Sequence, residues 1–248
     1  MKRINIIARY KEDLDWAKDL QGDIIVYNKG EDWKWDLPVR DVPNYGREAE
    51  TFVRAIVDLM TEDKIRQYDE IVLLQGNPLE HCPNLFDILT HSTTGYIPLA
   101  KWTTNHYTPK SDYIFDTHKH FVDLYFNETH KNMNMPEIPQ LTPVNLIFNC
   151  ADGSVVDFGN ESKDTMYLCS IIGIPYKQKT TSWANGAQYL LHRNLITNKD
   201  LKWWKELHKL LLYVSKDLGT DRIAYSIERI WPEIWKHKTV SYTFKGFV

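Results

Sequence analysis

Polar residues end or follow three apolar runs in the first third of the chain, at residues 3–9, 23–27 and 68–75. Arginine binds phosphate through two nitrogens, and amide side chains hydrogen-bond the hydroxyl groups of a ribose or a sugar. Continuous apolar runs of this length are typical of strands buried in a parallel sheet, where ligands bind at the carboxyl ends of the strands. The residues at these ends are therefore candidates for binding a ligand: Ala8, Arg9, Tyr10, Asn28, Gln75, Gly76 and Asn77.

The segments between these runs must position the candidate residues. Residues 44–60 carry apolar side chains at alternating steps of three and four, which predicts one apolar face of a long helix. Asn44 or a neighbour is expected to cap its first turn, and a shorter helix is expected at 13–20. Strand and helix thus alternate with connections long enough for parallel crossovers, so we expect one α/β domain.

The rest of the chain is less regular. We expect a helix at 116–127, and the prolines of 132–143 predict a loop. The other expected elements are strands at 144–149 and 187–192 and helices at 83–89, 200–216 and 221–235, the last interrupted by Pro232.

The composition disfavours several classes of protein. A net charge of −3 gives no sign of the basic stripe of a tight, non-specific nucleic-acid binder, although it leaves room for a local basic groove. The charged N-terminus lacks the apolar region of a signal peptide, and no run approaches the ~18 apolar residues of a membrane span. We therefore expect a soluble, cytoplasmic protein. Cys82, Cys150 and Cys169 lack CxxC spacing and indicate neither a disulfide framework nor a zinc site.

The order of the motifs resembles a known family. IIVYNKG, NYGREAETFVRAIV and DEIVLLQGNP follow one another as in the opening of type-A glycosyltransferases, which bind nucleotide sugars. WANGAQYLLHR and AYSIERIWPEIW are similar to the GAQ and ERxWP motifs of uncharacterised glycosyltransferase-like proteins that also carry NxGREA. The matched segments cover roughly residues 3–78 and 183–236. The resemblance implies a three-layer α/β sandwich with a mostly parallel sheet in a single domain 1–248, with a nucleotide-binding half 1–80 and an acceptor-side half 81–248.

The chain departs from this family at two acidic positions. The family has an acidic residue after the second strand and an Asp-x-Asp metal motif after a later one, where this chain has Asn28 and the amides of Gln75 and Asn77. A divalent cation prefers anionic oxygens, and amides supply only neutral ones. We therefore expect transfer without a metal, with Mn²⁺ or Mg²⁺ as the open alternative.

Without a metal, cations and backbone amides must stabilise the charge that develops on the leaving diphosphate. The best candidates are Arg9 and Arg47, and the resemblance adds Asn44 and Gly46 to the nucleotide-binding residues. Arg47 begins the long predicted helix, whose N-terminus favours anions. The alternative for each arginine is a structural ion pair: Arg9 with Glu12 or Asp13, and Arg47 with Glu48 or Glu50.

The candidates for the catalytic base lie near the C-terminus. Glu228 flanks the apolar stripe of the last predicted helix, where partial burial would raise its proton affinity; a structural pair with an arginine is the alternative. Asp221 is the reserve candidate and has helix capping as its alternative. For the acceptor or the donor sugar we expect Trp183, Gly186 and Gln188, although Trp183 is equally compatible with a place in the core.

Transfer of a sugar from a nucleotide-sugar donor to a hydroxyl acceptor is thus the leading hypothesis. The acceptor is a small molecule, a glycan or a hydroxymethylated base of viral DNA, the last disfavoured by the acidic balance. The second hypothesis is a binding protein for nucleotides or carbohydrates without catalysis. The third is a metal-dependent hydrolase, whose ligands would be drawn from Asp112, Asp116, His118 and His120. His81, four residues after Asn77, could separately bind a metal or phosphate, but an ordinary surface histidine is the preferred interpretation.

Overall fold

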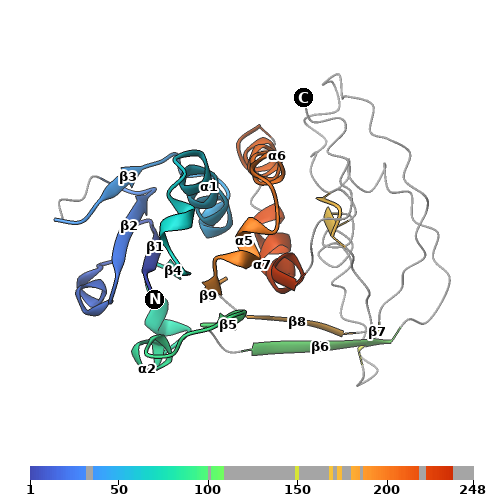
Figure 1. The fold of residues 1–248 in the computed structure, drawn as a ribbon. Helices are drawn as coiled ribbons and strands as arrows, with labels where there is room; N and C mark the ends of the chain where they lie inside the picture. Colours follow the sequence, from blue (N-terminus) through green and yellow to red (C-terminus); the bar gives the residue numbers. More distant parts are fainter. Residues whose placement is uncertain are drawn as a thin grey trace.

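The fold is described from a computed structural model, which covers residues 1–31, 36–99, 102–108, 149–150, 168–169, 172–174, 180–184, 187–217 and 222–236. Within these residues, a six-stranded mixed sheet forms the centre (Figure 1). Its strands, in sheet order, are β3 (Val39–Asp41), β2 (Asp23–Asn28), β1 (Arg3–Arg9), β4 (Glu70–Gln75), β9 (Tyr189–His192) and β5 (Tyr96–Pro98). The expected α/β class is confirmed, and the sheet is mixed, because β9 runs antiparallel to its neighbours β4 and β5.

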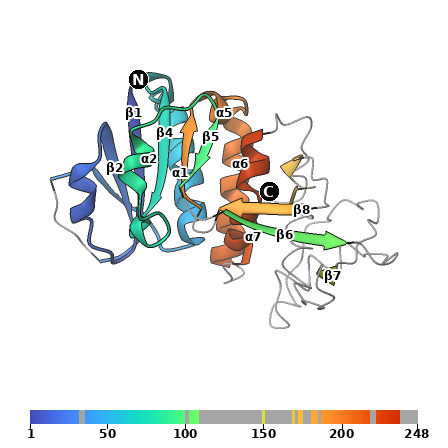
Figure 2. The ribbon, with the colours of Figure 1, turned by 90° about the horizontal axis from the view of Figure 1, so that it is seen from below.

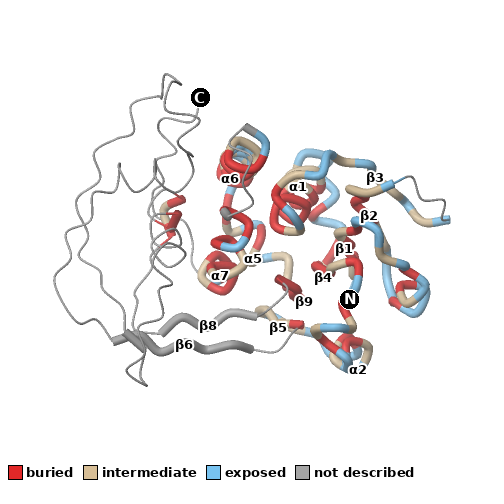
Figure 3. Tube along the Cα trace, turned by 180° about the vertical axis from the view of Figure 1, so that it is seen from behind, coloured by how far each residue is buried: buried red, intermediate tan, exposed pale blue. Residues whose placement is uncertain are grey.

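Helices cover the two faces of the sheet unequally. The long helices α1 (Arg47–Thr61), α6 (Leu201–Leu212) and α7 (Arg222–Lys236), with the short α5 (Asn194–Thr197), lie on one face. On the other face lie the 3-10 helix η1 (Asp15–Asp19) and the short helix α2 (Leu85–Leu89). One cluster of buried apolar residues lies between the sheet and the helices on each face (Figure 3). Because both faces of β1 and β4 are covered, these strands carry apolar side chains on both sides.

A smaller sheet has the order β7-β6-β8. It consists of β6 (Trp102–Thr108), β7 (Asn149–Cys150) and β8 (Thr180–Ala184). In Figure 2, β6 and β8 run side by side away from the main sheet, where they continue from β5 and into β9. Strands β3, β5, β6 and β8 were not predicted, because three-residue strands and polar strands carry little apolar signal.

Four tryptophans dominate the packing of α6 and α7. Trp203, Trp204, Trp231 and Trp235 are all fully buried, and the rings of Trp231 and Trp235 stack with centroids 4.7 Å apart. The predicted interruption of the last helix at Pro232 is wrong, because α7 continues through it to Lys236. Trp231 before the proline and Ile234 and Trp235 after it are buried against the core, and this packing offsets the hydrogen bond that the proline removes.

Most other predicted elements are present with shifted ends. The helix expected at 200–216 is α6, continued by a π-helical turn at Tyr213–Asp217. Asn44 does not cap α1: Gly46 occupies the N-cap position, and no side chain there accepts a hydrogen bond from the helix. The predicted helix 116–127 and loop 132–143 lie outside the described residues, as does the strand 144–149 except for its last residue.

Two further properties concern the described part of the chain. Cys82 and Cys169 are buried free thiols. Among the described helices, none has the length and apolar character to cross a membrane.

Candidate functional site

The strand order changes direction at β1. The chain proceeds outward from β1 through β2 to β3, and then crosses to β4 on the opposite side of β1. In open α/β sheets, ligands bind in the crevice outside the carboxyl ends of the strands at such a switch point. Ala8 lies opposite both Tyr27 and Gln75, so the three strands end side by side. We call the ends of β1, β2 and β4 with their following residues, 8–12, 28–31 and 75–77, the carboxyl edge.

Arg9 and Asn28 contact each other at the carboxyl edge. Arg9 is only 7% exposed, and its Nη1 donates to Asn28 Oδ1 over 2.7 Å. Its Nε donates to the backbone carbonyl of Glu12 over 3.0 Å. Asn28, also buried, donates from Nδ2 to Asp41 Oδ1 at the end of β3 over 2.9 Å. These two side chains therefore hold the ends of β1, β2 and β3 together.

Glu12 lies across Gly76 at the end of β4. A Cβ atom added at Gly76 would be 2.4 Å from Glu12 Oε2, so the Glu12 side chain lies directly over this glycine and would have to move to admit a larger residue. The same Oε2 accepts hydrogen bonds from the backbone N–H groups of Tyr10 and Lys11, over 2.7 and 3.0 Å. The indole of Trp16 donates to the Gly76 carbonyl over 2.9 Å, which fixes the other side of the turn.

Two carboxylates thus lie at the strand ends, where the sequence alone indicates amides. Asp41 contacts Asn28, and Glu12 lies against Gly76. Sequence reasoning missed both roles because each carboxylate belongs to a different segment from the amide it accompanies. The described residues nevertheless contain no group of three or more His, Cys, Asp or Glu side chains arranged to hold a metal ion.

The other predicted residues of β4 and β9 have separate surroundings. Gln188 is fully buried: its Oε1 accepts from the Gln75 backbone N–H over 3.2 Å, and its Nε2 donates to the Leu99 carbonyl over 3.1 Å. It links β4, β9 and the end of β5, with no exposed surface for a sugar. Asn77 is exposed and donates to Glu80 over 3.3 Å.

The remaining sequence candidates in this part of the chain are exposed or lie outside the description. Tyr10 is 45% exposed at the end of β1, and Asn44 is exposed before α1. For Trp183 the structure describes the backbone, within β8. Gly186, Asp221 and the possible metal ligands Asp112, Asp116, His118 and His120 lie outside the described residues.

The NYGREA motif forms a tight turn into α1. Gly46 has φ +62°, and a Cβ atom added there would be 2.7 Å from the Cβ of Glu50. Lys29, directly after β2, donates from Nζ to the carbonyls of Tyr45 and Arg47, the latter over 2.6 Å. The turn is therefore tied to the end of β2, and the start of α1 lies beside the carboxyl edge.

A buried group of charges supports this turn. Glu50 is fully buried and forms ion pairs with Lys29 at 2.8 Å and Arg54 at 2.6 Å, while His208 Nε2 is 2.7 Å from its Oε1. Burial raises the pKa of the Glu50 carboxyl, but the hydrogen bond with His208 and the charge of Lys29 outweigh it and lower this pKa to about 2. Burial lowers the pKa of the Lys29 ammonium, and Glu50 opposes that shift. We call these four residues the buried charge cluster; the sequence analysis assigned no role to Lys29 or His208.

Arg47, three residues before Glu50, has different surroundings. Its side chain is 46% exposed, Nη1 donates to the Tyr225 hydroxyl of α7 over 3.0 Å, and the guanidinium lies 5.0 Å from the centre of that ring. It forms a long ion pair with Glu48 at 3.6 Å, whereas Glu50 pairs with other partners. Arg47 therefore presents a partly exposed cation at the start of a fifteen-residue helix.

Glu228 lies on α7 three residues after Tyr225, which contacts Arg47. It is half-buried, beside the stripe of buried residues expected from the sequence: Ile223, Ile227, Ile230, Trp231 and Ile234. Arg229 Nη1 donates to the Tyr225 carbonyl over 2.9 Å. The expected position beside the apolar stripe is therefore confirmed, and the role as a base stays a prediction.

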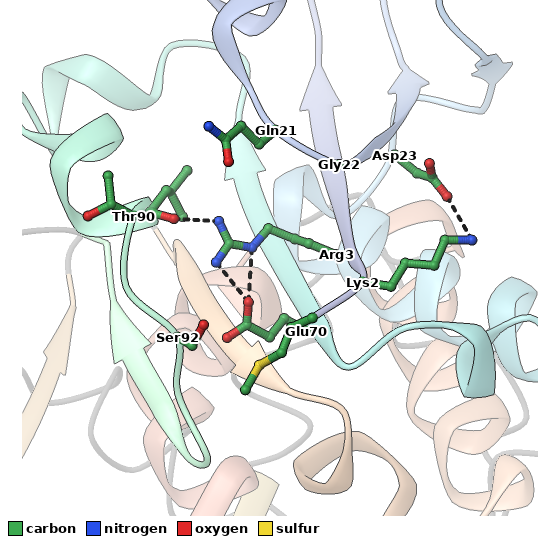
Figure 4. A pocket seen from close by; sticks show the side chains of 10 residues that line it. Lys2, Arg3, Gln21, Gly22, Asp23, Glu70, Thr90 and Ser92 are labelled. Carbon is green, nitrogen blue, oxygen red and sulfur yellow. Dashed lines mark hydrogen bonds and ion pairs between the residues drawn. The ribbon is translucent and has the colours of Figure 1, made fainter.

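Two cavities lie at the opposite, amino ends of the strands. One, of about 370 Å³, is lined by Arg3, Asp23 and Glu70 among others (Figure 4), and the other, of about 480 Å³, by Lys2, Arg40 and Tyr68 among others. In the first, Arg3 pairs with the buried Glu70 at 2.7 Å and donates to the Leu89 carbonyl over 2.6 Å. Its charged groups bind one another, so we assign the candidate site to the carboxyl edge despite these cavities.

Comparison of the chain with protein-family models, with curated proteins and with solved structures finds no match.

Proposed function

We propose that the protein is a glycosyltransferase that binds a nucleotide-sugar donor at the carboxyl edge and transfers its sugar to a hydroxyl acceptor. The observation that carries this proposal is the position of the switch point. The ends of β1, β2 and β4 meet there, and Lys29 joins them to the start of α1. Ligands with phosphate groups bind α/β sheets at such a point, beside a helix N-terminus.

Arg47 is the residue best placed to bind the diphosphate. Its guanidinium is partly exposed, and it lies at the positive end of the α1 dipole. Arg9 has a structural role instead: its Nε and Nη1 donate to Glu12 and Asn28 and so join the turns that follow β1 and β2. The amides of the first turn of α1 add donors for the leaving phosphate.

Glu228 is proposed as the base that takes the proton of the acceptor hydroxyl. It lies on the same helix as Tyr225, three residues after it, and Tyr225 contacts Arg47 at the start of α1. A carboxylate within reach of the acceptor hydroxyl can serve as the general base for transfer. The acceptor remains as expected from the sequence: a small molecule, a glycan or a hydroxymethylated base.

The test is release of nucleoside diphosphate from a panel of nucleotide sugars, incubated with and without Mn²⁺. We expect release from one donor and a higher melting temperature in its presence. Arg47→Ala should weaken donor binding ~10- to 100-fold, and Glu228→Gln should slow release ~100-fold or more. Arg66→Ala is the matched control, because Arg66 is 81% exposed and lies before β4, away from the carboxyl edge. A wild-type protein that neither binds nor hydrolyses any donor overturns the proposal.

A binding protein without catalysis is the second candidate. It relies on the same switch point and on the partly exposed Arg47, but it requires no base and so no role for Glu228. Donor binding without release, unaffected by Glu228→Gln, would identify this function.

A further inference from the structure

The Glu12 carboxylate is held at the switch point by only one of its two oxygens. Oε2 accepts both backbone N–H groups, from Tyr10 and Lys11. Among the described residues, no hydrogen bond reaches Oε1. The side chain is half-buried, so its second oxygen remains available to a ligand.

The surroundings of Glu12 fix this carboxylate in place. It lies over the Cα of Gly76, where a Cβ atom would be 2.4 Å from Oε2, and Trp16 holds the Gly76 carbonyl over 2.9 Å. The carboxylate therefore occupies the junction between β1 and β4 before any ligand binds. A carboxylate that is already ordered loses little conformational entropy when it accepts a further hydrogen bond from a ligand.

The chemistry of the free oxygen points to a hydroxyl group. An ionised carboxylate only accepts hydrogen bonds, so it repels the oxygens of a phosphate and binds O–H donors. Acidic residues near the switch point of dinucleotide-binding sheets bind ribose hydroxyls in this manner. Glu12 belongs to the turn after β1, whereas Arg47 begins α1, and the positive charge of Arg47 suits the phosphates.

We infer that Glu12 selects the donor by accepting a hydrogen bond from one hydroxyl of a vicinal diol. This inference rests on the proposed function, since it concerns the ligand bound at the carboxyl edge. The diol belongs either to the ribose or to the transferred sugar. A hydrogen bond to a charged acceptor gives ~10- to 100-fold discrimination against a ligand that lacks the hydroxyl.

The test is a set of affinities measured by calorimetry. UDP, GDP, ADP and CDP are compared first, and the tightest binder is then compared with its 2′-deoxy and 3′-deoxy forms and with its glucose and galactose conjugates. If the ribose carries the diol, the wild-type protein prefers the ribonucleotide over a deoxy form ~10- to 100-fold, and Glu12→Gln reduces that preference to about twofold. If the sugar carries it, the wild-type protein prefers a conjugate over the bare diphosphate, and Glu12→Gln removes that preference.

Two further variants separate the carboxylate's role from general damage. Glu80→Gln removes another carboxylate beside the carboxyl edge and should leave both preferences unchanged. Gly76→Ala displaces the Glu12 side chain but leaves the Glu12 carboxylate charged, so it should reduce the same preference as Glu12→Gln. If Glu12→Gln does not fold, Gly76→Ala alone tests the inference.

The inference is overturned if neither Glu12→Gln nor Gly76→Ala changes the preference of the wild-type protein, or if the wild-type protein binds nucleotides with no preference. A wild-type protein that binds none of the diphosphates or conjugates overturns the proposed function instead, and the inference with it.

Discussion

Arg47 and Glu50 lie one turn apart at the start of α1, yet their surroundings are opposite. Glu50 is fully buried and is surrounded by Lys29, Arg54 and His208. Arg47 is 46% exposed, and its side chain contacts the Tyr225 hydroxyl and the Glu48 carboxylate. The two residues belong to the same NYGREAE segment.

Within one motif, the buried residue therefore stabilises the turn, and the partly exposed residue is the one available to bind a ligand. Charges with several buried partners maintain the geometry of the turn, and their removal leaves an uncompensated charge inside the protein. A partly exposed charge contributes little to stability and can exchange its partner for a ligand. Variants of this motif should therefore divide into those that unfold the protein and those that only weaken binding.

Glu50→Gln should have the largest effect on stability. It leaves the ammonium of Lys29, whose side chain is 5% exposed, without its carboxylate, and we expect the free energy of unfolding to fall by about 3–5 kcal/mol. Urea denaturation followed by circular dichroism measures this. Glu48→Gln is the neighbouring control and should change stability by about 0.5 kcal/mol or less. Equal effects of the two variants would contradict the division between them.

The acid sensitivity of the buried charge cluster is the second prediction. The pKa of Glu50 is lowered from 4.5 to about 2 in the folded protein, so between these values the unfolded chain binds more protons. Stability from this group is thus complete above pH 4.5 and is lost as the pH falls towards 2, by about 3 kcal/mol in total. The difference in unfolding free energy between the wild-type protein and Glu50→Gln should shrink by this amount from pH 6 to pH 2. A difference independent of pH would show that Glu50 titrates normally.

The sequence predicts the frame of this motif better than its chemistry. The strand 3–9 and the helix that becomes α1 follow from local apolar periodicity, which depends on neighbours along the chain. The partners of Glu50 lie at Lys29 and His208, 21 residues before it and 158 after it, and no local pattern records such contacts. Glu12 and Gly76 likewise meet only because β1 and β4 are adjacent in the sheet.

Gly46→Ala should have an intermediate effect. The residue has φ +62°, and the new Cβ atom would be 2.7 Å from the Cβ of Glu50, so both backbone strain and contact oppose it. We expect a loss of about 1–3 kcal/mol, measured by the same denaturation. Gly95→Ala is the control, because its nearest neighbour would be 3.9 Å away. A Gly46→Ala protein as stable as this control would show that the turn adjusts without cost.

Arg47→Lys and Arg47→Ala should have the smallest effect on stability and a clear effect on binding. Both should change the free energy of unfolding by about 0.5 kcal/mol or less, because the side chain is partly exposed and its ion pair is long. Lysine keeps the charge at the start of α1 but cannot bind a phosphate through two nitrogens, so Arg47→Lys should retain part of the donor affinity that Arg47→Ala loses. Melting temperature and calorimetric affinity, measured on the same samples, separate the two effects. If Arg47→Ala instead unfolds the protein as Glu50→Gln does, the guanidinium serves to join α1 to Tyr225 of α7, and the phosphate must be bound by other groups of the carboxyl edge.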